Sequence, residues 1–156
     1  MAERTDILLV CSSGGHLLQL RSLAAAWSGL PHTWVVEDTP DTRSVLAGEK
    51  APFLKPVSAR DLRGAFRNAF LARKVLRKLR PQVVVTTGAA IAVPFAWLAR
   101  ARGIRVVYIE SITRIDEPSL SCRLVAPVAS RVYVQWPELV EHVRNARYAG
   151  AVLETA

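Results

Sequence analysis

The sequence predicts an α/β domain in which an open parallel sheet of about six strands carries helices on both faces. Short apolar runs rich in β-branched residues alternate with longer helical stretches along the chain. Most of these runs are apolar on both faces, as in parallel strands that helices cover on two sides. A length of 156 residues leaves room for one domain with a core of its own.

The expected elements follow one another in a regular order. Strands are expected at residues 7–11, 33–36, 52–57, 83–86, 106–109 and 132–134. Helices are expected at residues 16–27, 61–79, 89–102, 120–129 and 137–145. Turn residues at 29–31, at Arg80-Pro81 and at Gly103 follow the ends of expected helices. This succession predicts a Rossmann-like sheet, whose ligands bind beyond the carboxyl ends of the strands.

Composition and charge exclude several classes of protein. The chain is 51% hydrophobic and 22% charged, which excludes a disordered tail. Cys11 and Cys122 are too few for a zinc cluster, so we expect reduced cysteines, a cytoplasmic setting and no metal. The first residues lack a signal-peptide pattern, and no apolar run reaches the length of a membrane span. A net charge of +8 suggests a polyanionic partner.

A glycine loop follows the first expected strand: Ser12-Ser13-Gly14-Gly15-His16. Backbone N–H groups at the start of a helix favour a phosphate, and paired glycines allow its close approach. The spacing departs from GxGxxG and from the GxxxxGK[ST] loop, and a tight turn without a ligand remains the alternative. An imidazole at this position can take a proton from a hydroxyl near neutral pH, or it can have a structural or capping role.

Small residues also follow the fourth expected strand, at Thr86-Thr87-Gly88-Ala89-Ala90. Two such loops on neighbouring strands could hold a diphosphate between them. A closely packed helix with Pro94 in its first turns explains the same residues nearly as well.

A carboxylate, Glu110, closes the fifth expected strand. A glutamate after a run of apolar residues needs a partner if it is buried. It is a candidate acid or base, or a group that holds a sugar hydroxyl. Pairing with a basic residue such as Arg114 is equally compatible with the sequence.

Residues 60–80 hold eight basic residues and one acid, Asp61, so this segment accounts for +7 of the net charge. Apolar residues are interleaved with the basic ones, and such an amphipathic basic helix can lie on an anionic lipid surface. A merely solvated helix face is the alternative, and no nucleic-acid-binding motif accompanies the charge. The basic residues expected on a membrane surface are Arg63, Arg67, Arg73, Lys74, Arg77 and Lys78.

In order and spacing, these three loops resemble the acceptor-binding, amino-terminal half of a GT-B glycosyltransferase. The likeness is to oligosaccharide-biosynthesis proteins of the Alg-fourteen type and to bacterial exopolysaccharide (PssD-like) subunits, and it extends over nearly the whole chain. More distantly, the layout is similar to the amino-terminal half of the N-acetylglucosaminyltransferase that makes lipid II. The matching segments are Ser12 to Leu17, Thr87 to Ala90 with Pro94, and Tyr108 to Ser111.

The resemblance implies one subunit of a two-component, inverting glycosyltransferase, inactive or weak alone. This subunit would bind a polyprenyl-diphosphate-linked acceptor, and a second polypeptide would bind the nucleotide sugar, with UDP as its expected nucleotide. His16 and Glu110 would be the candidates for activating the acceptor hydroxyl, without a cofactor or metal. The residues expected at the acceptor diphosphate are Ser12, Ser13, Gly14, Gly15, Thr87, Gly88 and Ala89.

The resemblance also implies a place for each part of the chain. Residues 1–147 would form the acceptor-binding domain, and residues 148–156 a tail that contacts the partner. Family members in eukaryotes carry a membrane anchor that is absent here, so the basic helix would give peripheral attachment to the inner face of the cell membrane. Two alternatives remain: a non-catalytic adaptor that recruits a transferase to the membrane, and a dinucleotide-binding module in which Glu37 or Asp38 follows the glycine loop.

Overall fold

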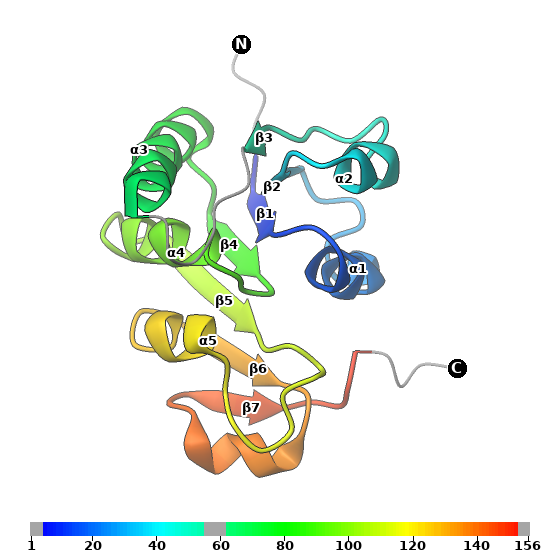
Figure 1. Ribbon diagram of the computed structural model, residues 1–156, viewed down its shortest axis with the longest axis vertical. Helices are drawn as coiled ribbons and strands as arrows, with labels where there is room; N and C mark the ends of the chain where they lie inside the picture. Colours follow the sequence, from blue (N-terminus) through cyan, green and yellow to red (C-terminus); the bar gives the residue numbers. More distant parts are fainter. Residues whose placement is uncertain (1–4, 55–61, 153–156) are drawn as a thin grey trace.

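A computed structural model describes residues 5–54 and 62–152 and contains one seven-stranded parallel sheet (Figure 1). The strand order is β3-β2-β1-β4-β5-β6-β7, so the chain starts near the middle and reverses direction once. The strands are β1 (Ile7–Cys11), β2 (His32–Glu37), β3 (Phe53–Leu54), β4 (Val83–Thr86), β5 (Arg105–Ile109), β6 (Arg131–Val134) and β7 (Ala146–Tyr148). This confirms the predicted α/β fold and its parallel sheet.

Helices cover both faces of the sheet. They are α1 (Gly15–Ser22), α2 (Pro40–Val45), α3 (Leu62–Leu79), α4 (Ala92–Arg100) and α5 (Leu120–Val125), with the 3₁₀ helices η1 (Ala24–Ala26) and η2 (Pro137–His142). The helices α3, α4 and α5 lie on one face, and α1 and α2 lie on the other (Figure 1).

Two apolar clusters result, because successive side chains of a strand point to opposite faces. In β1, Leu8 and Val10 join the cluster under α3, α4 and α5. Leu9 and Cys11 join the cluster under α1, where Trp27 and Trp34 meet edge to face with ring centroids 6.2 Å apart.

The structure departs from the sequence-based elements mainly at their ends. Within the described part of the chain, the strand expected at 52–57 appears as β3. Residues 55–57 of that strand lie outside the described part, and so do Arg60 and residue 61 of the expected basic helix. The last expected helix is the 3₁₀ helix η2. The strand β7 was not predicted, because its three residues are too short a run to indicate a strand. The helix α2 was missed too, although Thr39 and Thr42 form a capping box at its start.

The end of the described chain packs onto the sheet. Strand β7 runs through the expected domain boundary at residue 147. Beyond it, the Val152 N–H donates to Oε1 of the buried Gln135 over 2.7 Å, and Val152 packs against the α1-side cluster. Residues 148–152 therefore continue the domain rather than leave it.

Candidate functional site

The three sequence-predicted loops lie side by side at one edge of the sheet. Strand β1 pairs with β4, and β4 pairs with β5, both in parallel. Because parallel strands end at the same edge, the segments after Cys11, Thr86 and Ile109 are neighbours there. The expectation that the two small-residue loops adjoin each other is thus met.

His16 ties the first loop to the second. Its Nδ1 lies 2.8 Å from the carbonyl oxygen of Thr87, and the Thr87 hydroxyl donates to the His16 carbonyl oxygen over 2.9 Å. A carbonyl oxygen can only accept, so Nδ1 carries the proton in this contact. In the neutral ring, Nε2 then holds a lone pair, and the half-buried side chain lines a cavity. This is the arrangement that a general base needs.

The first loop is open. Gly14 and Gly15 are exposed, Ser12 and Ser13 are half-buried, and a Cβ added at either glycine would meet no atom within 4 Å. Gly14 has a φ of 70° and precedes α1 without any side-chain cap for that helix in the described part of the chain. The first-turn N–H groups of α1 therefore have no side-chain cap beside an open pair of glycines, as an anion site at a helix start requires.

The second loop is closely packed instead. Thr87 and Gly88 are buried, and the Gly88 N–H donates to the Thr86 hydroxyl over 3.1 Å. A Cβ at Gly88 would lie 2.5 Å from the Tyr108 hydroxyl oxygen. That N–H is thus bonded within the loop, and the role of Gly88 at the diphosphate stays a prediction. Ala89, with a φ of 67°, is the predicted residue of this loop that lines the cavity.

Glu110 is fully buried and holds the loop after β5 together. Its carboxylate accepts hydrogen bonds from the N–H groups of Ser111 and Ser119, each over 2.8 Å, and from the Ser119 hydroxyl at 3.0 Å. Ser119 is also the N-cap of α5. The hydrogen-bond partners of the Glu110 carboxylate are therefore Ser111 and Ser119, rather than Arg114. Glu110 is not among the residues that line the cavity, and its role as acid or base stays a prediction.

Burial keeps the neighbouring acidic groups neutral. Burial, and secondly the charge of Glu110, raises the pKa of the Tyr108 hydroxyl and that of the Cys122 thiol. Burial raises the pKa of the Cys11 thiol to about 12, and Glu37 adds to the rise. Both cysteines are free and buried. Thiols held in this state are not nucleophiles near neutral pH.

The cavity beside His16 has a volume of about 630 Å³ and lies between α3, α4, α5 and the loop after β5. Its apolar wall comes from α4 and α5, and its polar groups come from the loop after β5, from α5 and from α3. The lining residues are His16, Asn68, Ala89, Ala90, Val93, Pro94, Trp97, Ser111, Thr113, Arg114, Ser119, Leu120, Ser121 and Leu124. A ligand with an apolar part and a polar part fits such a lining.

The outer face of α3 is basic and apolar at once. Its predicted membrane-facing residues Arg67, Arg73, Lys74, Arg77 and Lys78 are exposed, and the Arg63 side chain lies outside the described set. Phe66 is 79% exposed and Phe70 is 68% exposed between them. In the described ranges, no helix has the length and apolar character that crossing a bilayer requires.

Further exposed apolar residues continue this face. Trp97 on α4, and Leu120 and Leu124 on α5, are exposed on the side of the sheet that α3 covers. The Trp97 indole N–H donates to the Leu124 carbonyl oxygen over 3.0 Å, which joins α4 to α5. The apolar surface therefore extends from α3 to the mouth of the cavity, where Trp97, Leu120 and Leu124 are also lining residues.

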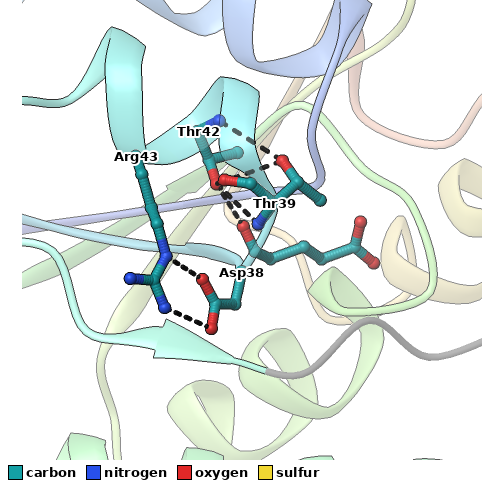
Figure 2. Close-up of polar contacts among 5 residues, drawn as sticks. Asp38, Thr39, Thr42 and Arg43 are labelled. Carbon is teal, nitrogen blue, oxygen red and sulfur yellow. Dashed lines mark hydrogen bonds and ion pairs between the residues drawn. The ribbon is translucent and has the colours of Figure 1, made fainter.

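Asp38, one of the two carboxylates considered for a dinucleotide-binding module, is paired with Arg43. Figure 2 shows that both oxygens of Asp38 accept from Arg43, over 2.6 and 2.9 Å, beside the Thr39–Thr42 cap of α2. Arg43 lowers the pKa of Asp38 through these hydrogen bonds. The guanidinium also lies 5.7 Å from the centre of the Phe53 ring. Asp38 is thus held by Arg43 beside the start of α2.

Comparison with known proteins identifies the family of this chain. The model of the family described as "Oligosaccharide biosynthesis protein Alg14 like" matches residues 58–152, well over half of the chain. The chain belongs to the Alg14 family. One relative, the "UDP-N-acetylglucosamine transferase subunit ALG14" of Yarrowia lipolytica, is 32% identical over 127 residues, which is 78% of this chain and 55% of the relative. The chain spans about half the length of the first such relatives.

A second kind of relative has a related name. The "UDP-N-acetylglucosamine--N-acetylmuramyl-(pentapeptide) pyrophosphoryl-undecaprenol N-acetylglucosamine transferase" of Gloeothece citriformis is 36% identical over 125 residues, covering 71% of this chain and 34% of that one. Among solved structures, MurG of Acinetobacter baumannii superposes with a TM-score of 0.71 at 17% identity, over 85% of this chain and 42% of MurG. The fold of this Alg14-family chain is therefore similar to part of a GT-B enzyme.

Sequence reasoning missed several residues in and around the candidate site. The buried Gln19 of α1 donates to the Glu110 carbonyl oxygen over 2.7 Å and accepts from the Ile112 N–H over 3.3 Å. Ser119 is the N-cap of α5, and its N–H group donates a hydrogen bond to the Glu110 carboxylate. Asn68 interrupts the buried side of the basic helix. A polar residue at a buried helix position is the one signal that the sequence contains for Gln19 and Asn68.

Proposed function

We propose that this chain is the acceptor-binding subunit of a two-component inverting glycosyltransferase that extends a polyprenyl-diphosphate-linked glycan. The observation that carries the proposal is the His16–Thr87 contact. It joins both loops and leaves a lone pair on Nε2 of a ring that lines a cavity with an apolar wall. The open N–H groups at the start of α1 suit the diphosphate, and the apolar wall suits the first part of the lipid.

The reaction assigns one chemical step to this chain. Nε2 of His16 takes the proton of the acceptor hydroxyl as its oxygen attacks the anomeric carbon of the donor sugar. The bond from that carbon to the nucleoside diphosphate breaks, and its electron pair leaves with the diphosphate. Relatives are named as subunits of a UDP-N-acetylglucosamine transferase, which supports UDP-N-acetylglucosamine as the donor on a partner chain. Residues 148–156 stay the predicted contact with that partner.

Substitution of His16 tests the proposal in the assembled complex. His16→Asn keeps a donor for the Thr87 carbonyl oxygen and removes Nε2. We expect an unchanged melting temperature and a loss of about 10²- to 10⁴-fold in kcat for transfer from UDP-N-acetylglucosamine to a prenyl-diphosphate-linked acceptor. The KM for the donor should not change, since the donor lies on the partner. A kcat within threefold of the unsubstituted complex would remove His16 from the chemistry.

The basic and apolar face of α3 supports peripheral attachment to the cytoplasmic face of a membrane. We expect the chain to sediment with vesicles that contain anionic lipid, and less so as salt is added. Replacing Arg73, Lys74 and Arg77 by glutamine should weaken this binding by about fivefold per charge. Arg105 and Arg131 are exposed at the amino ends of β5 and β6, so their replacement by glutamine is the matched control. Equal losses in both variants would show general charge attraction only.

The same surface favours a second candidate function, a non-catalytic adaptor that brings a transferase to the membrane. The His16→Asn complex separates the two functions. An adaptor keeps full turnover with that substitution and loses it, in the presence of vesicles, when the α3 charges are removed.

A further inference from the structure

Asn68 is an unusual residue on the buried side of α3. The residues buried on this helix recur every four positions, at Gly64, Asn68, Ala72 and Leu76. Asn68 is 3% exposed, and its Oδ1 has no hydrogen-bond partner in the described part of the chain. A buried acceptor without a partner lowers the stability of the fold. An apolar side chain at this position would avoid that cost, which points to a use for the amide.

The other polar side chains of the cavity are largely engaged with one another. Ser119 and Ser121 share hydrogen bonds with the Tyr108 hydroxyl at 3.2 and 3.0 Å. Ser111 and Thr113 lie 2.9 Å apart, hydroxyl to hydroxyl. Asn68 lines the same cavity as His16, so the side chain that carries this unpartnered acceptor forms part of the wall of the space where the proposed base acts.

A hydrogen-bond acceptor without a partner can be satisfied only by a ligand group that donates a hydrogen bond. A prenyl chain has no hydrogen-bond donors, and a diphosphate near neutral pH offers acceptors only. A sugar carries hydroxyl groups, and an amino sugar carries an N–H group as well, all of which donate. Of the three parts of a prenyl-diphosphate-linked sugar, only the sugar can therefore satisfy Oδ1 of Asn68.

We propose that Asn68 accepts a hydrogen bond from the acceptor sugar and is a specificity-determining residue of this cavity. This inference rests on the proposed acceptor-binding function and adds to it the residue that distinguishes a sugar-bearing lipid diphosphate from a bare one. Such discrimination is strong where a buried polar group would otherwise stay unpaired.

Two probes test the assignment on the full chain: farnesyl diphosphate, and farnesyl diphosphate that carries N-acetylglucosamine on its terminal phosphate. We expect the unsubstituted chain to bind the sugar-bearing probe more tightly. Asn68→Leu should weaken binding of that probe by about tenfold and leave the affinity for farnesyl diphosphate within twofold. The melting temperature should stay level or rise, because an unpaired buried acceptor is removed.

Further variants keep the test decisive if leucine packs badly. Asn68→Ala should show the same selective loss, and Asn68→Asp, which keeps an oxygen acceptor, should retain the preference for the sugar. An equal loss for both probes places Asn68 at the diphosphate or shows general disruption, and either result overturns the assignment. Unchanged binding of both probes makes Asn68 a packing residue and also overturns it. If the unsubstituted chain binds neither probe, the proposed acceptor-binding function itself is wrong.

Discussion

The two small-residue loops have similar sequences and opposite structures. The loop of residues 12–16 is open, and a Cβ at Gly14 or Gly15 would meet nothing within 4 Å. The loop of residues 86–89 is packed onto Tyr108, which leaves no room for a Cβ at Gly88. Glycine therefore gives access for a ligand in one loop and permits close packing in the other. Only the first loop has the properties of an anion site.

The largest effect is expected at the packed loop. Gly88→Ala places a methyl group against the Tyr108 hydroxyl at a φ of 105°, which an alanine adopts only under strain. We expect a loss of about 3 kcal/mol in the free energy of unfolding, or a melting temperature lower by about 10 °C. Thermal unfolding followed by circular dichroism measures it. Tyr108→Phe removes the clashing oxygen and should recover part of the loss, whereas an unchanged melting temperature in Gly88→Ala would contradict the packed loop.

A smaller loss is expected at Glu110, which supports the packed loop through Tyr108 and Ser119. Glu110→Gln turns one end of the side chain into a donor that faces N–H and O–H donors. We expect about 2 kcal/mol less stability, because a buried hydrogen bond to a charged group is lost. Urea unfolding measures it. Transfer activity per folded molecule should be nearly retained, and a selective loss in kcat with normal stability would return Glu110 to the catalytic candidates.

The open loop should respond in binding and not in folding. Gly15→Ala adds a methyl group in open space at the start of α1, so we expect stability to change by less than about 1 kcal/mol. Binding of farnesyl diphosphate, measured by calorimetry, should weaken by about tenfold, or 1.4 kcal/mol, as the methyl group covers the helix start. Leu18→Ala, on the exposed side of the same helix, is the control. Equal binding in Gly15→Ala and the unsubstituted chain would place the diphosphate elsewhere.

The smallest effect concerns pH, since a buried ionisable group lies next to each loop. Burial raises the pKa of Cys11, before the open loop, and that of Tyr108, under the packed loop. Each group stays neutral in the folded chain while the unfolded chain releases its proton, above pH 9.0 for Cys11 and above pH 10.0 for Tyr108. These buried groups, Cys122 included, should therefore leave stability unchanged between neutral pH and pH 9 and lower it above pH 9.

Substitutions distinguish the two contributions to this pH dependence. Cys11→Ala should reduce the fall in the free energy of unfolding that begins near pH 9 without abolishing it, because Cys122 also contributes there. Tyr108→Phe should flatten the part that begins near pH 10. Denaturant unfolding at several pH values is the measurement. A slope that neither substitution changes would mean that other groups are responsible.

Much of this fold was predictable because its signals are local. Apolar runs such as Val83–Thr86 and the turn at Gly103 identify strands and helix ends by themselves. The two small-residue loops were expected to lie side by side because their strands were expected to be neighbours in the sheet. Strand β7 was not predictable in this way, because its pairing with β6 and not its composition makes it a strand.

The role of each site residue was less predictable, because it depends on partners distant in sequence. Gly88 and Gly15 look equivalent until Tyr108 is placed, twenty residues beyond Gly88. Glu110 looks catalytic at a strand end, and only the fold brings the N-cap Ser119 onto it. The position of His16 in the loop can be read from the sequence. The direction of its ring depends on Thr87, 71 residues away.

Gln19 has a mechanical consequence. Its amide spans from α1 to the backbone of residues 110 and 112, with one hydrogen bond at each end. His16 lies one turn earlier on the same helix. A shift of the segment that follows β5 would therefore act through this side chain on the turn of α1 that carries His16.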